Sequence, residues 1–371
     1  MKILVTGAKG FIGKNLITEL KNRKYTDIFE FDLDTDPILL NKFCKESDFV
    51  FHLAGVNRPK DQSEFMEGNF GFTSILLDLL RKYKNICPIM LSSSIQAELD
   101  NPYGNSKKSG EKLLINYGKE TGAKALIYRF PNVFGKWCRP NYNSVVATFC
   151  HNIANDLPIT VNDPSVVMNL VYIDDVVNEL INALEGKENR KVEFCEVSVV
   201  HSITLGEIAD LIYSFKKSRG ERSIPDMSDE LTKKLYSTYL SYLPKEKFSY
   251  ELMMNIDSRG SFTEFIKTHD RGQISVNISK PGITKGNHWH HSKNEKFLVV
   301  SGKGVIRFRK IDSDEIIKYF VSGDKMEVVD IPTGYTHSIE NIGDTDMVTI
   351  MWATEIFEPE KPDTYYLEVQ V

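Results

Sequence analysis

Apolar runs and amphipathic stretches alternate along roughly the first 240 residues of the chain. Short apolar runs bounded by turn residues are typical of buried strands, whereas apolar positions three and four apart indicate helices. Strands that alternate with helices predict βαβ units and hence a parallel sheet covered on both faces. The predicted strands are Ile3–Thr6, Ile28–Phe31, Phe49–Ala54 and Ile89–Ser92, and the predicted helices are Asn15–Asn22, Asn69–Tyr83 and Gly104–Gly118.

From about Met254 the pattern changes to short strands separated by Gly, Pro and Asp turns. The clearest are Gln273–Ser279, Glu295–Val300, Lys303–Arg309 and Met347–Trp352. This spacing predicts an all-β sandwich or barrel. A polar stretch, Lys216–Ser228, lies between the two regions. We therefore expect an α/β Rossmann-type domain over residues 1–243 and an all-β barrel over residues 244–371.

Composition narrows the class of protein. The 371 residues are 41% hydrophobic and carry a formal net charge of −5, which fits two globular domains and argues against a nucleic-acid partner. No apolar run approaches the roughly 18 residues of a membrane span. Five cysteines without a CxxC pair argue against a disulfide framework. The first residues run directly into a strand and a glycine turn, so we expect no signal peptide and a cytoplasmic protein.

A glycine-rich turn of the form GxxGxxG follows the first predicted strand and precedes a helix. Glycines at such a turn let the backbone approach a pyrophosphate, which binds at the free N–H groups of the helix start. The strand–turn–helix context predicts a nucleotide site. The residues expected to contact the cofactor here are Gly7, Lys9, Gly10, Phe11, Ile12 and Gly13.

Asp32 stands at the end of the second predicted strand, where an acid can hold the adenosine ribose. A carboxylate accepts hydrogen bonds from a 2′-hydroxyl and repels a 2′-phosphate, so Asp32 favours NAD. Lys9 and Lys14 offset this preference toward NADP. The alternative is a solvated acidic turn formed with Glu30 and Asp34.

Tyr103 and Lys107 are four residues apart and therefore share one face of a predicted helix. A lysine ammonium at this position is expected to depress the tyrosine pKa and to hold the ribose, so that Tyr103 can transfer a proton near neutrality. Ser94 belongs to a serine cluster that ends the preceding strand, and its hydroxyl can reach a substrate carbonyl.

Through these motifs, the first ~240 residues resemble an extended short-chain dehydrogenase/reductase, the class that acts on nucleotide sugars. The resemblance implies that Ser94 polarises the substrate carbonyl, Tyr103 is the acid and Lys107 supports it. It places Asn69 near the proton path and Ala54 at the cofactor, with Pro131 and Asn132 flanking the nicotinamide. The other matching segments are Asp48–Gly55, Arg129–Gly135 and Val171–Val176.

The chain departs from this family in two places. The interval from Asp32 to Asp48 is too short for the usual adenine-contacting strand. Met168 and Asn169 stand where the family often has an arginine that binds the diphosphate of the sugar nucleotide. The basic residues that could bind this diphosphate instead are Arg58, Lys136 and Arg139.

Four of the eight histidines fall between His288 and His337. His288 and His290 are two apart and so share one face of a strand, Glu295 follows after a turn, and His337 comes from a later strand. Three imidazoles and a carboxylate suit zinc, manganese, iron or nickel. His291 is a rival ligand or a free base.

This spacing resembles the two-part cupin signature, and the segment Asp257–Glu264 is similar to cupin epimerases of 4-keto-6-deoxy nucleotide sugars. In those enzymes the equivalent of His288 is the base. Here His288 belongs to the predicted metal site, and the remaining candidate bases are His291, Lys296, Tyr335 and Glu264.

The whole chain resembles the bifunctional capsular-polysaccharide enzymes of the CapF type, through Ile95-Gln96, Gly135–Cys138, Leu235–Leu240 and the histidine cluster. The resemblance implies a zinc-bearing cupin, C3 epimerisation of a UDP-4-keto-6-deoxy-2-acetamido sugar, NADPH reduction of the C4 ketone to the L-talo product, and a homodimer. Asp32 keeps NADH open as the cofactor.

Two other functions stay open. In the first, the chain is a single-function nucleotide-sugar 4-ketoreductase, and its cupin is structural or dimerising. In the second, the chain is a non-enzymatic sensor of nucleotide sugars. Tyr103 and Lys107 argue against the sensor, because a sensor needs no acid–base pair.

Overall fold

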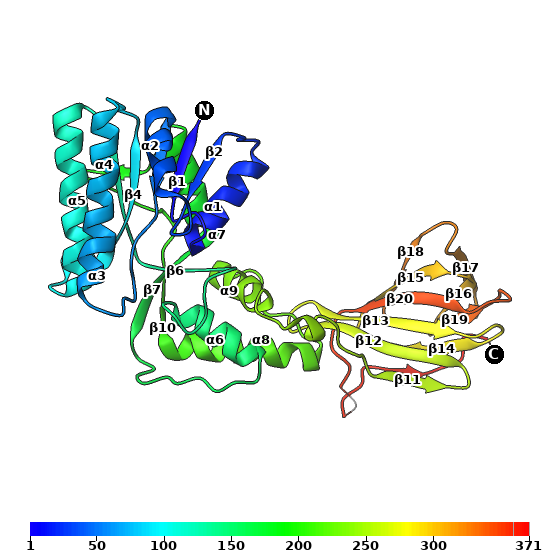
Figure 1. The fold of residues 1–371 in the computed structure, drawn as a ribbon. Helices are drawn as coiled ribbons and strands as arrows, with labels where there is room; N and C mark the ends of the chain where they lie inside the picture. Colours follow the sequence, from blue (N-terminus) through cyan, green and yellow to red (C-terminus); the bar gives the residue numbers. More distant parts are fainter. Residues whose placement is uncertain (359, 371) are drawn as a thin grey trace. The chain divides into compact units, whose positions relative to one another are not determined.

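The computed structural model describes residues 1–358 and 360–370 (Figure 1). The chain forms two compact units, which are described separately. Unit 1 comprises Met1–Tyr213 and Asp229–Pro244, and unit 2 comprises Ser214–Ser228 and Lys245–Val371. Residues 214–228 thus belong to unit 2, although they come before residue 244 in the sequence. The domain boundary that we expect between residues 243 and 244 stays a prediction.

Unit 1 is built on a 7-stranded sheet with the order β2-β1-β3-β4-β5-β9-β8. All neighbours from β2 to β9 pair in parallel, and only β8 is antiparallel. The parallel Rossmann-like sheet is thus confirmed. The strands are β1 (Ile3–Thr6), β2 (Ile28–Phe31), β3 (Phe49–His52), β4 (Ile89–Ser94), β5 (Ala125–Phe130), β8 (Arg190–Lys191) and β9 (Phe194–Cys195).

Helices cover both faces of this sheet. Apolar residues of α1 (Phe11–Asn22) and α7 (Ile173–Leu184) pack on one face, in the same core cluster as Ile3 and Val5. The cluster on the other face includes Leu4 and is formed with α2 (Pro37–Glu46), α4 (Phe72–Lys82) and α5 (Pro102–Thr121). Because successive strand residues point to opposite faces, β1 contributes to both cores.

The sheet order explains the short interval after Asp32. Only α2 lies between β2 and β3, and β3 pairs with β1 on the side opposite β2. β2 is therefore an edge strand, and the chain reverses direction across the sheet at β1. In open parallel sheets, ligands bind at the carboxyl ends of the strands beside such a reversal.

Unit 1 also contains a 3-stranded sheet with the order β10-β7-β6. Its strands are β6 (Asn132–Phe134), β7 (Val167–Tyr172) and β10 (His201–Thr204). The remaining helices of unit 1 are α3 (Ser63–Phe65), the π-helix η1 (Met66–Gly71), the 3₁₀-helix η2 (Ile95–Glu98), α6 (Val145–Ala154) and α9 (Glu230–Leu240).

Unit 2 contains two antiparallel sheets, with the orders β11-β12-β13-β20-β15-β18 and β17-β16-β19-β14-β21. One core cluster takes residues from both sheets, among them Phe297 and Val329 of the first and Ile306 and Ile339 of the second. The two sheets therefore face each other, and the all-β prediction is confirmed. The first sheet comprises β11 (Met254–Asp257), β12 (Gly260–Thr268), β13 (Gly272–Ser279), β15 (Glu295–Ser301), β18 (Val328–Ile331) and β20 (Met347–Ala353). The second comprises β14 (Thr284–Trp289), β16 (Lys303–Lys310), β17 (Ile316–Ser322), β19 (Tyr335–Asn341) and β21 (Tyr365–Tyr366).

The polar stretch Lys216–Ser228 is not a plain interval between two regions. Its first part belongs to α8 (Leu205–Glu221), and Ile224 N donates to Lys267 O at 3.1 Å within unit 2. A 3₁₀-helix, η3 (Lys245–Lys247), follows where the chain enters unit 2 again. Among the residues that the structure describes, no helix has both the length and the apolar character of a membrane span.

We predict that Gly13→Ala destabilises the protein by about 1–3 kcal/mol, although alanine is normally more stable than glycine inside a helix. A Cβ at Gly13 would lie 2.2 Å from Gly7 O and 2.8 Å from Ala8 O, so the turn must open. Gly220→Ala is the matched control, because Gly220 also lies in a helix and a Cβ there meets nothing within 4 Å. Urea unfolding should show opposite signs for the two variants, and equal signs would contradict this account.

Candidate functional site

The glycine turn lies against the end of β3. Gly7 has φ +68°, and a Cβ on it would lie 2.7 Å from the backbone nitrogen of Ala54. The N-cap of α1 is Gly10, and no side chain caps the helix. The N–H groups of its first turn are therefore left for an anion. The structure thus brings Ala54 and the predicted Gly7–Gly13 turn together.

The Asp32 carboxylate lies beside this turn and holds it. Its two oxygens accept hydrogen bonds from the backbone N–H groups of Lys9 (2.7 Å) and Leu33 (2.8 Å). The Lys9 ammonium forms an ion pair with Asp34, and both side chains are exposed. The lysine that was expected to favour a 2′-phosphate is therefore already paired with an acid, whereas Lys14 is exposed on α1.

Ser94, Tyr103 and Lys107 meet at the carboxyl end of β4. Ser94 is the last residue of β4, and Asn101 caps α5 by accepting from Gly104 N at 2.8 Å, with Pro102 in the first turn. This cap sets where the helix begins, and so places Tyr103 and Lys107 on its first turns. The Lys107 Nζ atom lies 5.9 Å from the centroid of the Tyr103 ring.

The expected effect of Lys107 on Tyr103 is wrong in this structure. Burial raises the pKa of Tyr103, and a hydrogen bond with Ser94 only partly opposes it. The Lys107 ammonium instead donates to the carbonyl of Ser92 at 3.1 Å. Burial also lowers the pKa of Lys107 to about 8, against the opposing charge of Glu111.

Asn69 connects the loop after β3 with α5. It lies in the π-helix η1, a geometry that often marks functional positions. Its amide accepts from Val56 N (2.9 Å) and donates to Ser106 Oγ (3.0 Å). A Cβ at Gly55 would lie 2.7 Å from Asn69 Oδ1 and 2.9 Å from Lys107 Nζ. Glycine at position 55 therefore permits the approach of the asparagine and the lysine.

Two buried groups behind this site were not assigned from the sequence. His52 is held between the hydroxyls of Thr6 (2.7 Å) and Thr73 (2.9 Å), and burial lowers the pKa of His52 to about 3. Glu111 accepts from Arg129 Nη2 at 2.7 Å and from the hydroxyl of Ser93. Glu111 follows Lys107 by four residues on α5, which is the one signal in the sequence that could have found it.

The three candidate bases for a diphosphate differ in their surroundings. Lys136 forms an ion pair with Asp174 at 2.5 Å. Arg58 and Arg139 both lie over the ring of Tyr142, at 5.9 and 5.1 Å from its centroid. Both arginines are exposed, and among the described residues neither has an ion pair with a carboxylate. They are the better placed pair for an anion.

Pro131 and Asn132 lie where β5 passes into β6. Asn132 Nδ2 donates to the carbonyl of Asn169 at 3.3 Å. Asn169, which stands where the family often has an arginine, is therefore in direct contact with β6.

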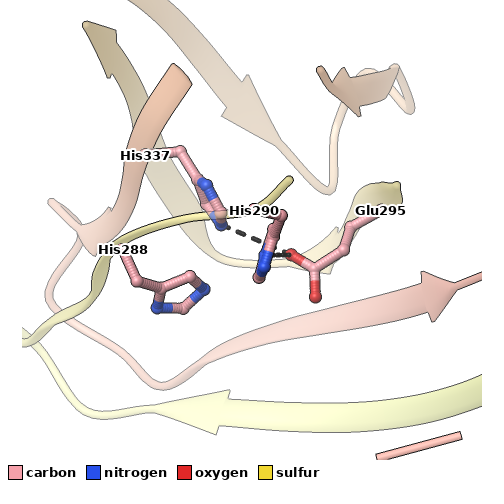
Figure 2. Close-up of side chains that lie close together, drawn as sticks. All are labelled: His288, His290, Glu295 and His337. Carbon is pink, nitrogen blue, oxygen red and sulfur yellow. Dashed lines mark ion pairs between the residues drawn. The ribbon is translucent and has the colours of Figure 1, made fainter. Parts of the chain in front are cut away.

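In unit 2, His288, His290, Glu295 and His337 converge (Figure 2). One donor atom from each side chain lies within 4.8 Å of the others. Glu295 Oε2 is 3.4 Å from His290 Nε2 and 3.3 Å from His337 Nε2. The four predicted ligands thus come together from the β14 segment, β15 and β19.

A bulge in β14 sets this geometry. The pairing with β19 shifts between Gly286 and His288, and Asn287 has φ +58°. The extra residue places His288 directly opposite His337. A Cβ at Gly286 would lie 2.7 Å from His337 O, so this bulge requires glycine.

The donor set fits a divalent metal ion. His290 Nε2, Glu295 Oε2 and His337 Nε2 are buried and have no hydrogen-bond partner in the described structure. Buried polar atoms are normally paired, and a metal ion would satisfy all three. Burial lowers the pKa of His288 to about 4, so this imidazole is neutral at pH 7 and can act as a ligand.

The Glu295 carboxyl is ionised for an electrostatic reason. Burial alone would raise its pKa, but the contacts with His290 and His337 and the charge of Lys293 hold the pKa below its usual range. Lys293 Nζ lies 3.2 Å from Glu295 Oε1. The sequence did not single out Lys293, because only the turn between β14 and β15 brings it to the carboxylate.

The candidate bases of unit 2 have other partners. Glu264 pairs with Arg222 (2.8 Å) and Lys267 (2.7 Å), and Lys296 pairs with Asp330. Both candidate bases therefore have side-chain partners of opposite charge.

His291 and Tyr335 have mainly aromatic and apolar neighbours. The His291 ring lies 4.5 Å from that of Trp289 and 4.9 Å from that of Tyr365. Tyr335 packs on the core of unit 2. Trp289, which lies between His288 and His290 in the sequence, therefore packs on the rings of His291 and Tyr365.

Comparisons with known proteins cover both units. Residues 3–195 match the NAD dependent epimerase/dehydratase family, and residues 255–365 match the polysaccharide biosynthesis C-terminal domain. A UDP-2-acetamido-2,6-beta-L-arabino-hexul-4-ose reductase of Pseudomonas aeruginosa is 45% identical over 369 residues, which are 100% of this chain and 99% of that protein.

Solved structures agree with these matches. The crystal structure of the capsular polysaccharide assembling protein CapF from Staphylococcus aureus is 59% identical, with a TM-score of 0.95 over 99% of this chain and 100% of that one. A UDP-glucuronic acid 4-epimerase from Bacillus cereus, solved with NAD, is 24% identical with a TM-score of 0.54 over 65% of this chain and 96% of that one. The second likeness concerns the fold alone.

The buried Lys107 predicts a pH-dependent stability difference. Because the pKa of Lys107 is about 8 in the folded protein and the ordinary pKa of a lysine is 10.5, charged Lys107 destabilises the fold below pH 8, and this penalty disappears as the pH rises to 10.5. Lys107→Met should therefore be more stable than wild type at pH 7, by up to about 3 kcal/mol.

Urea unfolding at pH 7, 9 and 10.5 measures this difference. It should shrink toward the highest pH, since other groups titrate equally in both proteins. A difference that does not change with pH would mean that Lys107 carries no such penalty.

Proposed function

The chain belongs to the NAD dependent epimerase/dehydratase family and to the two-domain capsular-polysaccharide proteins of the CapF type, and from this premise we propose that it is a bifunctional nucleotide-sugar enzyme. In this proposal unit 2 is a cupin that epimerises C3 of a UDP-4-keto-6-deoxy-2-acetamido sugar. Unit 1 reduces the C4 ketone with NADPH to UDP-2-acetamido-2,6-dideoxy-L-talose, a precursor of UDP-N-acetyl-L-fucosamine. The observation that carries the proposal is the presence of two separate polar clusters, one in each unit.

For the reduction, we assign the proton transfer to Tyr103. Ser94 donates a hydrogen bond to the C4 carbonyl oxygen, and Tyr103 gives its phenolic proton to that oxygen as the carbonyl becomes an alcohol. Lys107 would hold the ribose of the bound cofactor, and water returns a proton to the tyrosinate that remains. Bound NADPH supplies the hydride to C4.

The Gly7–Gly13 turn and Asp32 would hold the dinucleotide. The glycines let the backbone reach the pyrophosphate, and the Asp32 carboxylate reaches the ribose. NADH remains a possible cofactor, because the acids around Asp32 repel a 2′-phosphate. We assign the UDP diphosphate to Arg58 and Arg139, whose guanidinium groups lie over Tyr142 and have no carboxylate partner among the described residues.

For the epimerisation, the C4 ketone makes the neighbouring C3 proton acidic. A divalent metal, zinc in our proposal, supplies a Lewis acid for the charge on the ketone oxygen. His288, His290, Glu295 and His337 would hold it, since their donor atoms converge and three of these atoms have no other partner. Burial keeps His288 neutral for this task.

A second candidate is a single-function 4-ketoreductase in which unit 2 is structural. It is favoured by the name of the P. aeruginosa relative, which mentions a reductase only. The two candidates differ in whether the C3 proton exchanges with solvent.

Proton NMR of a UDP-4-keto-6-deoxy-2-acetamido sugar in D₂O separates them. We expect the C3 signal to disappear with the protein before any nicotinamide is added, and the ketone to be reduced after NADPH is added. An unchanged C3 signal followed by reduction would leave the single-function reductase. Removal of the metal by a chelator should stop the exchange, and exchange that persists would remove the metal from catalysis.

Two variants assign the half-reactions to the two clusters. Tyr103→Phe should slow the reduction by about 10²–10⁴-fold and leave the C3 exchange unchanged, because only the proton donor is lost. Glu295→Gln should abolish the exchange and leave NADPH binding intact. Loss of both activities in either variant would contradict the assignment.

Asp34 should control the cofactor preference. Asp34→Asn releases the Lys9 ammonium and removes one negative charge, so the ratio of NADPH to NADH efficiency should rise about 2- to 5-fold. The matched control is Asp78→Asn, which changes the net charge equally but alters an ion pair on α4. Steady-state kinetics with both cofactors tests the difference, and an equal ratio in the two variants would show that Lys9 has no part in it.

A further inference from the structure

The C-terminal segment runs alongside the strand that carries the first predicted metal ligand. β21 pairs with β14, with Tyr366 opposite His288 and Tyr365 opposite Trp289. Leu367 N donates to the carbonyl of Asn287 at 3.0 Å. β14 therefore lies between β19 and the end of the chain in the second sheet of unit 2.

The backbone of Asp363 fixes one ligand. His290 Nδ1 is hydrogen-bonded to the carbonyl oxygen of Asp363. Because a carbonyl can only accept, the proton must be on Nδ1, and Nε2 then carries the lone pair. His290 Nε2 is the atom that faces Glu295 Oε2, at 3.4 Å, and it has no other partner. The contact thus selects the tautomer that binds a metal through Nε2.

The carboxylate of Asp363 fixes the turn that follows. It accepts from three successive backbone N–H groups, of His291 (2.9 Å), Ser292 (2.7 Å) and Lys293 (2.9 Å), and from the Ser292 hydroxyl (3.0 Å). This turn connects β14 with Glu295 at the start of β15. It therefore sets the distance between His290 and Glu295, and it directs Lys293 to the Glu295 carboxylate.

We propose that Asp363 is a positioning residue for the metal centre of unit 2, which orients His290 through its carbonyl and the turn before Glu295 through its carboxylate. Its carbonyl stays near His290 because its carboxylate is anchored on the three amides. The inference rests on the proposed metal site. Partners that orient a histidine ligand typically change metal affinity by about 10- to 100-fold when they are lost.

Asp363→Asn tests the proposal, because an amide nitrogen would then face N–H donors. The matched control is Asp226→Asn: Asp226 likewise accepts from a serine N–H (2.9 Å) and hydroxyl (2.6 Å), those of Ser228 in unit 2. Zinc affinity is measured by competition with a chromophoric chelator. The His290 tautomer is read by ¹⁵N NMR of the metal-free, histidine-labelled full chain.

We expect Asp363→Asn to weaken zinc binding by about 10- to 100-fold and to shift His290 away from a pure Nδ1–H tautomer, with neither change in the control. Asp363→Glu keeps the charge and should bind zinc more tightly than Asp363→Asn. A lower melting temperature with unchanged affinity and tautomer would mean that Asp363 only stabilises the turn, and would overturn the proposal.

The tautomer also separates this inference from the proposed function. If the wild-type chain binds no divalent metal, the function proposed for unit 2 fails. The metal-free NMR spectrum still decides whether Asp363 controls His290, and a wild-type His290 protonated on Nε2 would overturn the positioning role.

Discussion

The backbone of Gly7 lies directly against the backbone of Ala54, and the site of unit 1 depends on this close approach. It joins the turn after β1 to the end of β3, at the point where the sheet order reverses. Only a residue without a Cβ permits the contact. The Asp32 carboxylate is bonded to the same turn through Lys9 N, and the Lys107 ammonium lies close to Gly55, the residue after Ala54.

Unit 2 reaches its site by a similar backbone device. A bulge with glycine at position 286 places His288 opposite His337, as the glycines of unit 1 place a helix against a strand. In both units, therefore, polar side chains converge because a short piece of backbone adopts a geometry that most residues disfavour. The glycines permit the close backbone contacts that bring the polar side chains of each site together.

Both clusters contain buried groups that cost stability. The Lys107 ammonium has its pKa lowered to about 8, and three donor atoms of the histidine cluster have no described partner. Such groups persist where they serve a ligand, because a fold selected only for stability would pair them or replace them by apolar residues. The apolar cores beneath them, such as those around Leu4 and Ile339, provide the compensating stability.

The amino-acid sequence alone determined the local patterns. The strands, the GxxGxxG turn, the Tyr103–Lys107 pair and the four predicted metal ligands were readable because each depends on residues close together or on a recurrent spacing. The helix starts were not: α1 begins at Phe11 and not at Asn15, and α5 begins at Pro102 and not at Gly104. Only the tertiary structure decided which distant groups meet them. Lys9, which the sequence offers to a 2′-phosphate, forms an ion pair with Asp34 in the structure. Burial raises the pKa of Tyr103, whereas the sequence predicts that Lys107 lowers it. Asp363 meets His290 across 73 positions of chain, and that separation leaves no periodic signal in the sequence. Hydrophobic periodicity records which face of an element is buried, whereas the partner of a buried polar atom depends on how the elements pack.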